Sequence, residues 1–254
     1  METYICCNVF VPLRSGPSHK SEMVSQVLFG EKYKVIGKAG AWVKVLTLFD
    51  DYQGWIDTAH LQDMPDRDYG RGQVLNRSLP CHRADGSKLV LEAGCEIYSP
   101  DYKKGTFSVG TETFSVPEGF SGKFTKVSES KADTAMRFLN TPYIWGGRLP
   151  SAIDCSGLTQ LVYKIHGLAI PRDSSLQAEK GEAISFLEET NPGDLLFFDN
   201  ETGRINHVGL FLSKGLVIHA SGRVRIDRLD HQGIYRADLN RYVHKLRMIR
   251  RISP

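Results

Sequence analysis

The spacing of hydrophobic residues changes near position 128 and divides the chain into two parts. Before this position, short apolar runs such as Lys32–Ile36 and Phe107–Val109 alternate with glycines. Short strands separated by glycine turns are typical of small all-β barrels. After it, an apolar stripe at helical spacing precedes several strands, which is typical of an α+β domain. We therefore expect an all-β part followed by an α+β part.

The all-β part contains two series of short strands, which indicates two small domains. Between the two series, Met64–Asp68 is polar and contains a proline, as expected for a linker. We therefore predict domains at residues 1–64, 65–128 and 129–254.

In the α+β part, one helix is predicted to carry a cysteine in its first turn. Its apolar residues recur at helical spacing, at Leu158, Leu161, Val162 and Ile165. Asp154 is a suitable N-cap before this run, and Gly167 is a suitable stop after it. Cys155 would then lie at the positive end of the helix dipole, which favours a thiolate. We expect the pKa of this thiol to fall below the roughly 8.5 of a free cysteine.

Two histidines about fifty residues later are candidate partners of this cysteine. Asn206–Leu212 and Leu216–Ala220 are predicted strands, and Ser213–Gly215 between them is typical of a turn. With the turn centred on Ser213, His207 and His219 lie directly opposite each other. We assign His207 as the base for Cys155 and His219 as the residue that orients it, the general pattern of an activated nucleophile.

Each of these residues alone also has a plain structural interpretation. A lone buried cysteine usually serves as a small hydrophobic residue, and a lone histidine in a strand is usually a satisfied core residue. The helix-start position of Cys155 and the pair of histidines together favour catalysis.

Composition excludes several classes of partner. The net charge of +3 over 254 residues gives no case for nucleic acid or for a membrane surface, and no apolar run of membrane-spanning length is present. The densest basic segment, Arg241–Arg251, interleaves its charges with apolar residues and is interpreted as a strand with a solvated face. The histidines have no third ligand at a characteristic spacing, and a phosphate-binding glycine loop is absent. We therefore predict no metal and no cofactor.

The cysteines bear on the compartment. Cys6, Cys7, Cys81, Cys95 and Cys155 make an odd number and contain no C-x-x-C pair. Together with the absence of a secretory signal at the start of this sequence, this predicts reduced thiols in a cytoplasmic protein. The alternative is a periplasmic or secreted protein from which a signal peptide has been removed.

The order of motifs resembles the NlpC family of papain-like cysteine peptidases. The motifs are Tyr143–Arg148, Asp154–Gly157, Pro192–Phe198, His207–Gly209 and His219–Ser221. The closer similarity is to the γ-D-glutamyl-L-diamino-acid endopeptidases, which carry bacterial SH3-like domains before the peptidase. The resemblance implies two small all-β SH3-like barrels, the second divergent, followed by an α+β papain-like cysteine peptidase domain.

By this resemblance, the substrate is a peptidoglycan-derived muropeptide that begins with free L-Ala. The enzyme would hydrolyse the γ-D-Glu–L-diamino acid bond during recycling of cell-wall peptides. The oxyanion of the intermediate needs donors, and the candidates are the Cys155 backbone N–H and the Tyr143 hydroxyl. The alternative for Tyr143 is simple packing.

Several further residues are candidates for binding this substrate. A carboxylate at Asp154 can receive the free ammonium group, and the family implies the same for Glu22 and Tyr52 of the first SH3-like domain. Arg148 can pair with a substrate carboxylate or tie down its own loop. Ser156, Asp173 and Ser174 match family positions that contact substrate. Asp173 is alternatively a helix N-cap, and Glu22 alternatively a solvated surface charge.

Two other functions stay open at the level of sequence. The same triad can serve an amidase or acyltransferase that acts on another substrate. A non-catalytic cell-wall-binding module is the third possibility, against which the intact Cys155, His207 and His219 argue.

Overall fold

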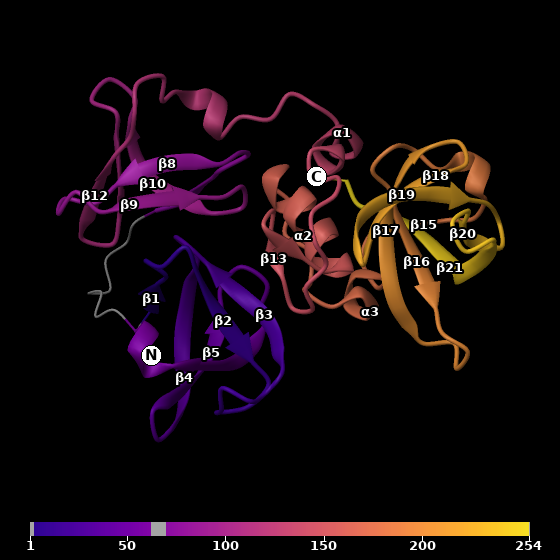
Figure 1. Cartoon of the computed structure of the whole chain (residues 1–254), viewed down its shortest axis with the longest axis horizontal. Coiled ribbons are helices and arrows are strands. Elements are labelled where there is room, and N and C mark those ends of the chain that lie inside the picture. The colour runs from indigo at the N-terminus through magenta and orange to yellow at the C-terminus, as the bar shows by residue number, and fades with distance from the viewer. Residues whose placement is uncertain (1–2, 62–69, 254) are drawn as a thin grey trace. The chain divides into compact units, whose positions relative to one another are not determined.

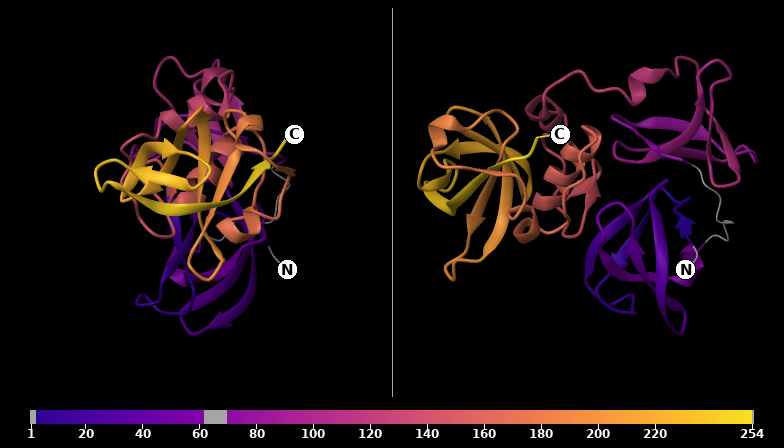
Figure 2. Two further views of the ribbon diagram at one scale, coloured as in Figure 1. Left: turned by 90° about the vertical axis from the view of Figure 1, so that its right-hand side faces the viewer. Right: turned by 180° about the vertical axis from the view of Figure 1, so that it is seen from behind.

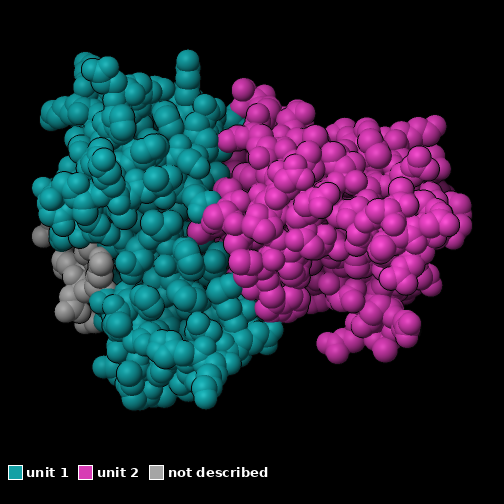
Figure 3. Space-filling model, viewed as in Figure 1, with its two compact units in different colours: residues 1–127 teal, residues 128–254 magenta. Residues whose placement is uncertain are grey.

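The computed structural model describes residues 3–61 and 70–253 (Figure 1). The chain divides into two compact units, residues 1–127 and residues 128–254 (Figure 3). The linker predicted at Met64–Asp68, and with it the predicted boundary between residues 64 and 65, lies outside the described residues. Among the described helices, none is both long enough and apolar enough to span a bilayer.

Unit 1 consists of two six-stranded antiparallel sheets that share one strand order. The first sheet is ordered β1-β4-β5-β6-β2-β3 and the second β7-β10-β11-β12-β8-β9, so each strand of the second corresponds to the strand six places earlier. The first sheet contains β1 (Thr3–Ile5), β2 (Phe10–Arg14), β3 (Met23–Leu28), β4 (Lys32–Ala39), β5 (Trp42–Thr47) and β6 (Gln53–Asp57), followed by the 3-10 turn η1 (Thr58–His60). The second contains β7 (Gln73–Val74), β8 (Leu79–His82), β9 (Lys88–Leu91), β10 (Glu96–Asp101), β11 (Thr106–Val109) and β12 (Glu112–Ser115), followed by η2 (Gly122–Phe124). The repeated order agrees with the predicted second copy, whose identity as an SH3-like barrel stays a prediction.

The turn between β3 and β4 joins the two sheets of unit 1. Phe29 in this turn packs edge-on against Phe107 and Phe114 of the second sheet. The next residue, Gly30, has φ +82°, and a Cβ there would lie 2.1 Å from the Glu96 carbonyl oxygen. Glycine is therefore required by both conformation and space.

Unit 2 has an α-helical layer and one antiparallel sheet (Figures 1 and 2). The helices are α1 (Lys131–Met136), α2 (Cys155–Ile165) and α3 (Ser174–Gln177), and they gather on one side of the sheet, against β17. Outside the main sheet lie the short pair β13 (Arg148–Leu149) and β14 (Ala152–Ile153), and the 3-10 turn η3 (Leu187–Glu189). The sheet contains β15 (Glu182–Ile184), β16 (Leu195–Asp199), β17 (Ile205–Ser213), β18 (Leu216–Ser221), β19 (Arg223–Leu229), β20 (Gly233–Arg236) and β21 (Arg241–Arg251).

The long strand β21 closes this sheet on itself. The order is β15-β21-β16-β17-β18-β19-β20, and β21 also pairs with β20. One end of β21 pairs with β20, its middle with β16 and its other end with β15. The strand predicted at Arg241–Arg251 is confirmed; exposed and covered residues alternate from His244 to Met248, and its last residues are covered.

The predicted cysteine helix is confirmed, with one difference in its burial. Asp154 caps α2 by accepting a hydrogen bond from the Gly157 N–H at 2.7 Å. The sequence predicts one apolar face, but every residue of α2 is buried. The polar face is covered because its side chains find buried partners: the Thr159 hydroxyl donates to Gln177, and Gln160 donates to the Ile170 carbonyl oxygen.

Candidate active site

Cys155 is held at the start of α2 by the cap and by a close approach of two backbone segments. A Cβ at Gly157 would lie 2.1 Å from the Gly147 carbonyl oxygen, so the first turn of α2 can pack on this loop only with glycine there. The Asp154 N–H donates to the same oxygen at 3.2 Å. The cysteine is therefore fixed in orientation, and only 6% of its surface is exposed.

The surroundings of Cys155 raise the pKa of its thiol instead of lowering it. Burial is the main cause and the nearby Asp154 carboxylate adds to it, so the pKa rises from 9.0 to about 12. The Val208 N–H and the Arg172 guanidinium act in the opposite direction but are outweighed. The expected depression of this pKa was wrong because desolvation and a neighbouring anion exceed the helix dipole. The resting cysteine is a neutral thiol.

His207 and His219 are brought together, but not in the predicted register. Strands β17 and β18 pair Gly209 with His219. The turn consists of Lys214 and Gly215, so it is centred later than the predicted Ser213, and a bulge between Phe211 and Ser213 offsets only one residue of this difference. His207 is therefore two residues away from the position opposite His219, on the same face of the sheet. The two imidazoles still reach each other across this offset of two residues, and His207 Nε2 lies 2.8 Å from His219 Nδ1.

A carboxylate that the sequence analysis missed determines which ring nitrogens carry protons. His219 Nε2 lies 2.9 Å from Asp227 Oδ2, and an ionised carboxylate can only accept, so His219 donates from Nε2. Neutral His219 then presents a lone pair at Nδ1, which accepts the N–H of His207 Nε2. His207 consequently carries its lone pair at Nδ1, as a base requires.

The histidines are neutral in this arrangement. Burial lowers the pKa of His207 well below 6.5, and the nearby His219 and His244 add to the effect. Burial also lowers the pKa of His219, although the hydrogen bond to Asp227 opposes it. The thiol lies against the backbone N–H of Val208, the residue that follows His207. A neutral thiol and a neutral base are thus placed on adjoining elements, α2 and β17.

A third histidine, His244 of β21, lies beside the pair. Its ring stacks on His207 with centroids 4.1 Å apart and an interplanar angle of 13°. One ring nitrogen from each of His207, His219 and His244 lies within 4.8 Å of the others. Among the described residues, these three histidines are the group whose spacing could hold a metal ion. Parallel rings direct their in-plane lone pairs side by side instead of toward one point, and His207 and His219 already bind each other. The cluster fits a hydrogen-bonded relay better than a metal centre.

Tyr143 lies near the thiol, as the sequence analysis requires of an oxyanion donor. Its backbone bridges to Ile153, next to the cap residue. Burial raises the pKa of its hydroxyl, and the neighbouring Cys155 and Asp154 raise it further. The hydroxyl therefore stays protonated at all ordinary pH values and can donate a hydrogen bond.

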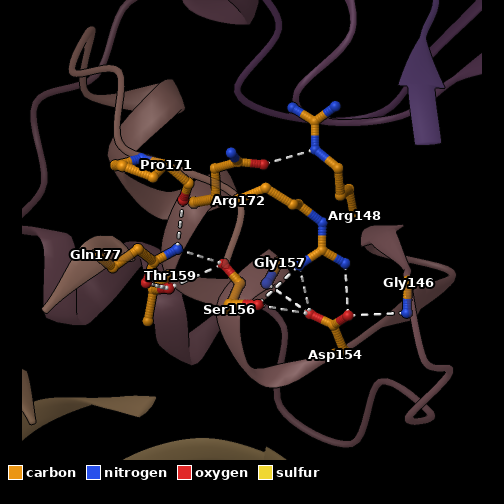
Figure 4. A network of polar contacts seen from close by, with 10 residues as sticks. Gly146, Arg148, Asp154, Ser156, Gly157, Thr159, Pro171, Arg172 and Gln177 are labelled. Carbon is orange, nitrogen blue, oxygen red and sulfur yellow. Dashed lines mark hydrogen bonds and ion pairs between the residues drawn. The ribbon is translucent and has the colours of Figure 1, made fainter. Parts of the chain in front are cut away.

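Asp154 and Ser156 are engaged by a buried arginine that the sequence analysis did not single out (Figure 4). Arg172 donates from Nη1 to Asp154 Oδ1 at 3.1 Å, from Nη2 to Oδ2 at 2.5 Å, and from Nη1 to Ser156 Oγ at 2.7 Å. The Gly146 N–H also donates to Oδ2, at 2.8 Å. With the Gly157 bond these donors occupy the carboxylate, so substrate binding by Asp154 and Ser156 stays a prediction.

The other candidate residues of unit 2 have local roles in the structure. Arg148 donates from Nε to Gln160 at 2.6 Å and is buried, which matches the loop-tying interpretation. Asp173 occupies the N-cap position of α3 but makes no side-chain cap bond. It is half-buried, as is Ser174, and contacts of either residue with substrate stay predictions.

The candidates of unit 1 stay predictions too. Glu22 is exposed just before β3, and Tyr52 packs against the core of the first sheet.

The raised thiol pKa predicts an unusual pH dependence for alkylation of Cys155. Because the thiol ionises only near pH 12 and the base has a depressed pKa, the reacting state is the neutral pair. We expect the iodoacetamide rate at Cys155, followed by peptide mass, to stay flat from pH 7 to about pH 10. The same chain unfolded in urea should show the ordinary thiol midpoint near roughly pH 8.5. A midpoint below pH 7 in the folded protein would instead show a preformed thiolate–imidazolium pair.

Comparisons with known proteins agree with this geometry. Residues 140–243 match the NlpC/P60 family, and residues 13–61 match the bacterial dipeptidyl-peptidase SH3 domain. The gamma-D-glutamyl-L-lysine dipeptidyl-peptidase of Bacillus subtilis is 29% identical over 82% of this chain and 75% of its own length. The corresponding protein of Bacillus cereus is 28% identical over 80% of this chain and 68% of its own length.

The fold is shared with a solved structure. An NlpC/P60 family protein from Bacillus cereus superposes with a TM-score of 0.82 over the whole of both chains, at 22% identity. Residues 140–243 are therefore an NlpC/P60 domain, the domain of a cysteine peptidase family, and residues 13–61 before it are a bacterial dipeptidyl-peptidase SH3 domain.

Proposed function

We propose that this protein is a cysteine endopeptidase that hydrolyses the γ-D-Glu–L-diamino acid bond of muropeptides with a free N-terminal L-Ala. The observation that carries the proposal is the continuous relay from Asp227 through His219 to His207, whose neighbour Val208 lies against the thiol of Cys155. The printed names of the two Bacillus relatives support the choice of bond.

The residues of the site account for each step of acyl transfer. His207 Nδ1 takes the thiol proton as the sulfur of Cys155 attacks the γ-carbonyl carbon, which gives a tetrahedral oxyanion. The Cys155 backbone N–H and the Tyr143 hydroxyl donate to this oxygen. His207 then returns the proton to the leaving amine of the diamino acid, and a thioester remains. Water, deprotonated by His207, hydrolyses the thioester and releases the free thiol.

The relay stabilises the charge that develops on His207 during the attack. When His207 becomes an imidazolium, His219 Nδ1 accepts its Nε2–H, and the Asp227 carboxylate balances the charge through His219. A neutral resting pair suits this general-base mechanism, because the positive charge is present only while the oxyanion is.

Asp154, Glu22 and Tyr52 are separate candidates for recognition of the free ammonium group, and of these the Asp154 carboxylate already accepts from Arg172 and from the Gly146 and Gly157 N–H groups. We also place the reaction in the cytoplasm, where released wall peptides would be recycled. The five cysteines are all free and buried, which is compatible with a reducing compartment.

The test is cleavage of defined peptides with free and blocked amino ends. We expect L-Ala-γ-D-Glu-L-Lys to be cleaved, and its N-acetyl form to lose at least ~100-fold in kcat/KM, because the ammonium pocket then holds unpaired polar groups. The variant Cys155→Ala controls for contaminating activity. Equal cleavage of both peptides would overturn the free-end requirement. Cleavage of neither, with turnover of another amide or thioester, would favour the amidase or acyltransferase alternative.

A further inference from the structure

Asp227 of β19 is buried next to His207 and His219. It is the first member of a chain of contacts that runs through His219 to His207. Its Oδ2 accepts from His219 Nε2 at 2.9 Å, while His219 Nδ1 faces His207 Nε2 at 2.8 Å. His219 is fully buried and Asp227 is 8% exposed. Water is therefore a poor substitute for this carboxylate as the partner of His219.

A second set of contacts keeps the Asp227 carboxylate ionised. Arg225 donates from Nη2 to Oδ1 at 2.8 Å, and its Nε lies 2.6 Å from Oδ2 as an ion-pair contact without hydrogen-bond geometry. Burial alone would raise the pKa of Asp227, but the hydrogen bonds from His219 and Arg225 outweigh it and the pKa is lowered. Asp238 holds Arg225 from the other side at 3.1 Å.

We propose that Asp227 is a positioning residue that sets the tautomers of both histidines and so places the lone pair of His207 at Nδ1. This inference rests on Cys155 acting as the nucleophile of the proposed function, but not on the identity of the substrate. Without an acceptor at Oδ2, neutral His219 is free to carry its proton at Nδ1. That proton would oppose the His207 Nε2–H, and His207 would have to present a lone pair at Nε2 and a proton at Nδ1. In that state it cannot accept the thiol proton.

The competing interpretation is that Asp227 only anchors Arg225 and the strand β19. The two roles differ in their dependence on His219. A tautomer role acts through the imidazole of His219 alone, whereas an anchoring role persists whatever residue occupies position 219. In His219→Gln, the amide oxygen can accept from His207 Nε2–H without help from a carboxylate.

The first experiment measures kcat, KM and the Cys155 alkylation rate in Asp227→Asn and Asp227→Ala. The alanine variant is included because an asparagine amide can turn either its oxygen or its nitrogen toward His219. We expect kcat to fall by ~10–100-fold with little change in KM, less than when the direct orienting partner of a catalytic histidine is altered. Asp238→Asn, which loosens Arg225 but leaves the His219 contact in place, is the matched control and should stay within about 2-fold of wild type.

The second experiment compares the same substitution in the His219→Gln background and records the histidine ¹⁵N spectrum. Bare and protonated ring nitrogens have distinct shifts, so we expect His207 and His219 to change tautomer in Asp227→Asn or Asp227→Ala. In the His219→Gln background, Asp227→Asn should change kcat by less than about 2-fold.

The outcomes distinguish the tautomer role of Asp227 from an anchoring role, and they distinguish failure of this inference from failure of the proposed function. Unchanged tautomers together with wild-type alkylation in both Asp227 variants would overturn the role, as would an equal loss of kcat in the His219→Gln background. If wild-type protein fails to cleave muropeptides while alkylation and tautomers respond as expected, the proposed substrate is wrong and the positioning role stands.

Discussion

Replacing Cys155 with alanine should remove ~10⁴–10⁶-fold of the peptidase rate, and replacing His207 with alanine should cost nearly as much. The thiol has a pKa of about 12 and is protonated at neutral pH, so it cannot attack until a base takes its proton. Neither residue therefore contributes to the peptidase rate once the other has been removed. The double variant should be no slower than either single variant, measured as kcat on the free muropeptide.

A buried cysteine outside the site supplies the control for this comparison. Cys81 is also a free, fully buried thiol, and burial raises its pKa to about 11. Cys81→Ala should keep kcat within about 2-fold, although it will lower the free energy of unfolding by on the order of 1 kcal/mol. If the rate losses of Cys155→Ala and His207→Ala multiply in the double variant, the two residues do not act as one unit.

The features that were predictable from sequence are those set by neighbouring residues. The extent of α2 follows from its periodic apolar residues, from the Asp154 cap and from Gly167, all within one short segment. The two histidine strands and the strand at Arg241–Arg251 follow from local apolar patterns in the same way. The assignment of Cys155 to the first helical turn depended only on this local information.

The missed features depend on contacts between distant segments. The register of β17 and β18 depends on which two residues form the turn, Lys214 and Gly215, and on a bulge between Phe211 and Ser213, and the turn signal in Ser213–Gly215 specifies neither. His244 and Asp227 reach the site only through the pairing of β21 and β19 with their neighbours. Arg172 directly precedes the candidate residues Asp173 and Ser174, but nothing local distinguishes a buried arginine from a surface one.

The wrong sign for the thiol pKa has the same origin. The helix dipole can be predicted from the position of Cys155 in the first turn. The burial that opposes it is supplied by segments far along the chain, among them β17 and β18, which pack against α2. A sequence argument that includes only the local favourable effect therefore predicts the wrong direction.

Arg172→Met should lower the free energy of unfolding by about 3–5 kcal/mol, because it removes one partner of a buried ion pair. The Arg172 guanidinium is 2% exposed and provides three of the donors to Asp154 and Ser156 (Figure 4). Removing it leaves the Asp154 carboxylate buried without a counter-charge. The carboxylate keeps three uncharged donors, the backbone N–H groups of Gly146 and Gly157 and the Ser156 hydroxyl.

Urea unfolding, followed by circular dichroism, measures this loss, and two further variants identify its cause. Arg137→Met removes an ion pair of the same kind with Glu129 at the surface, where the side chains are 31% and 35% exposed, and should cost less than about 1 kcal/mol. Asp154→Asn combined with Arg172→Met removes the stranded charge while asparagine retains the ability to cap α2. The double variant should therefore be more stable than Arg172→Met alone. If it is instead less stable, the loss in Arg172→Met comes from packing of the long side chain and not from the unpaired carboxylate.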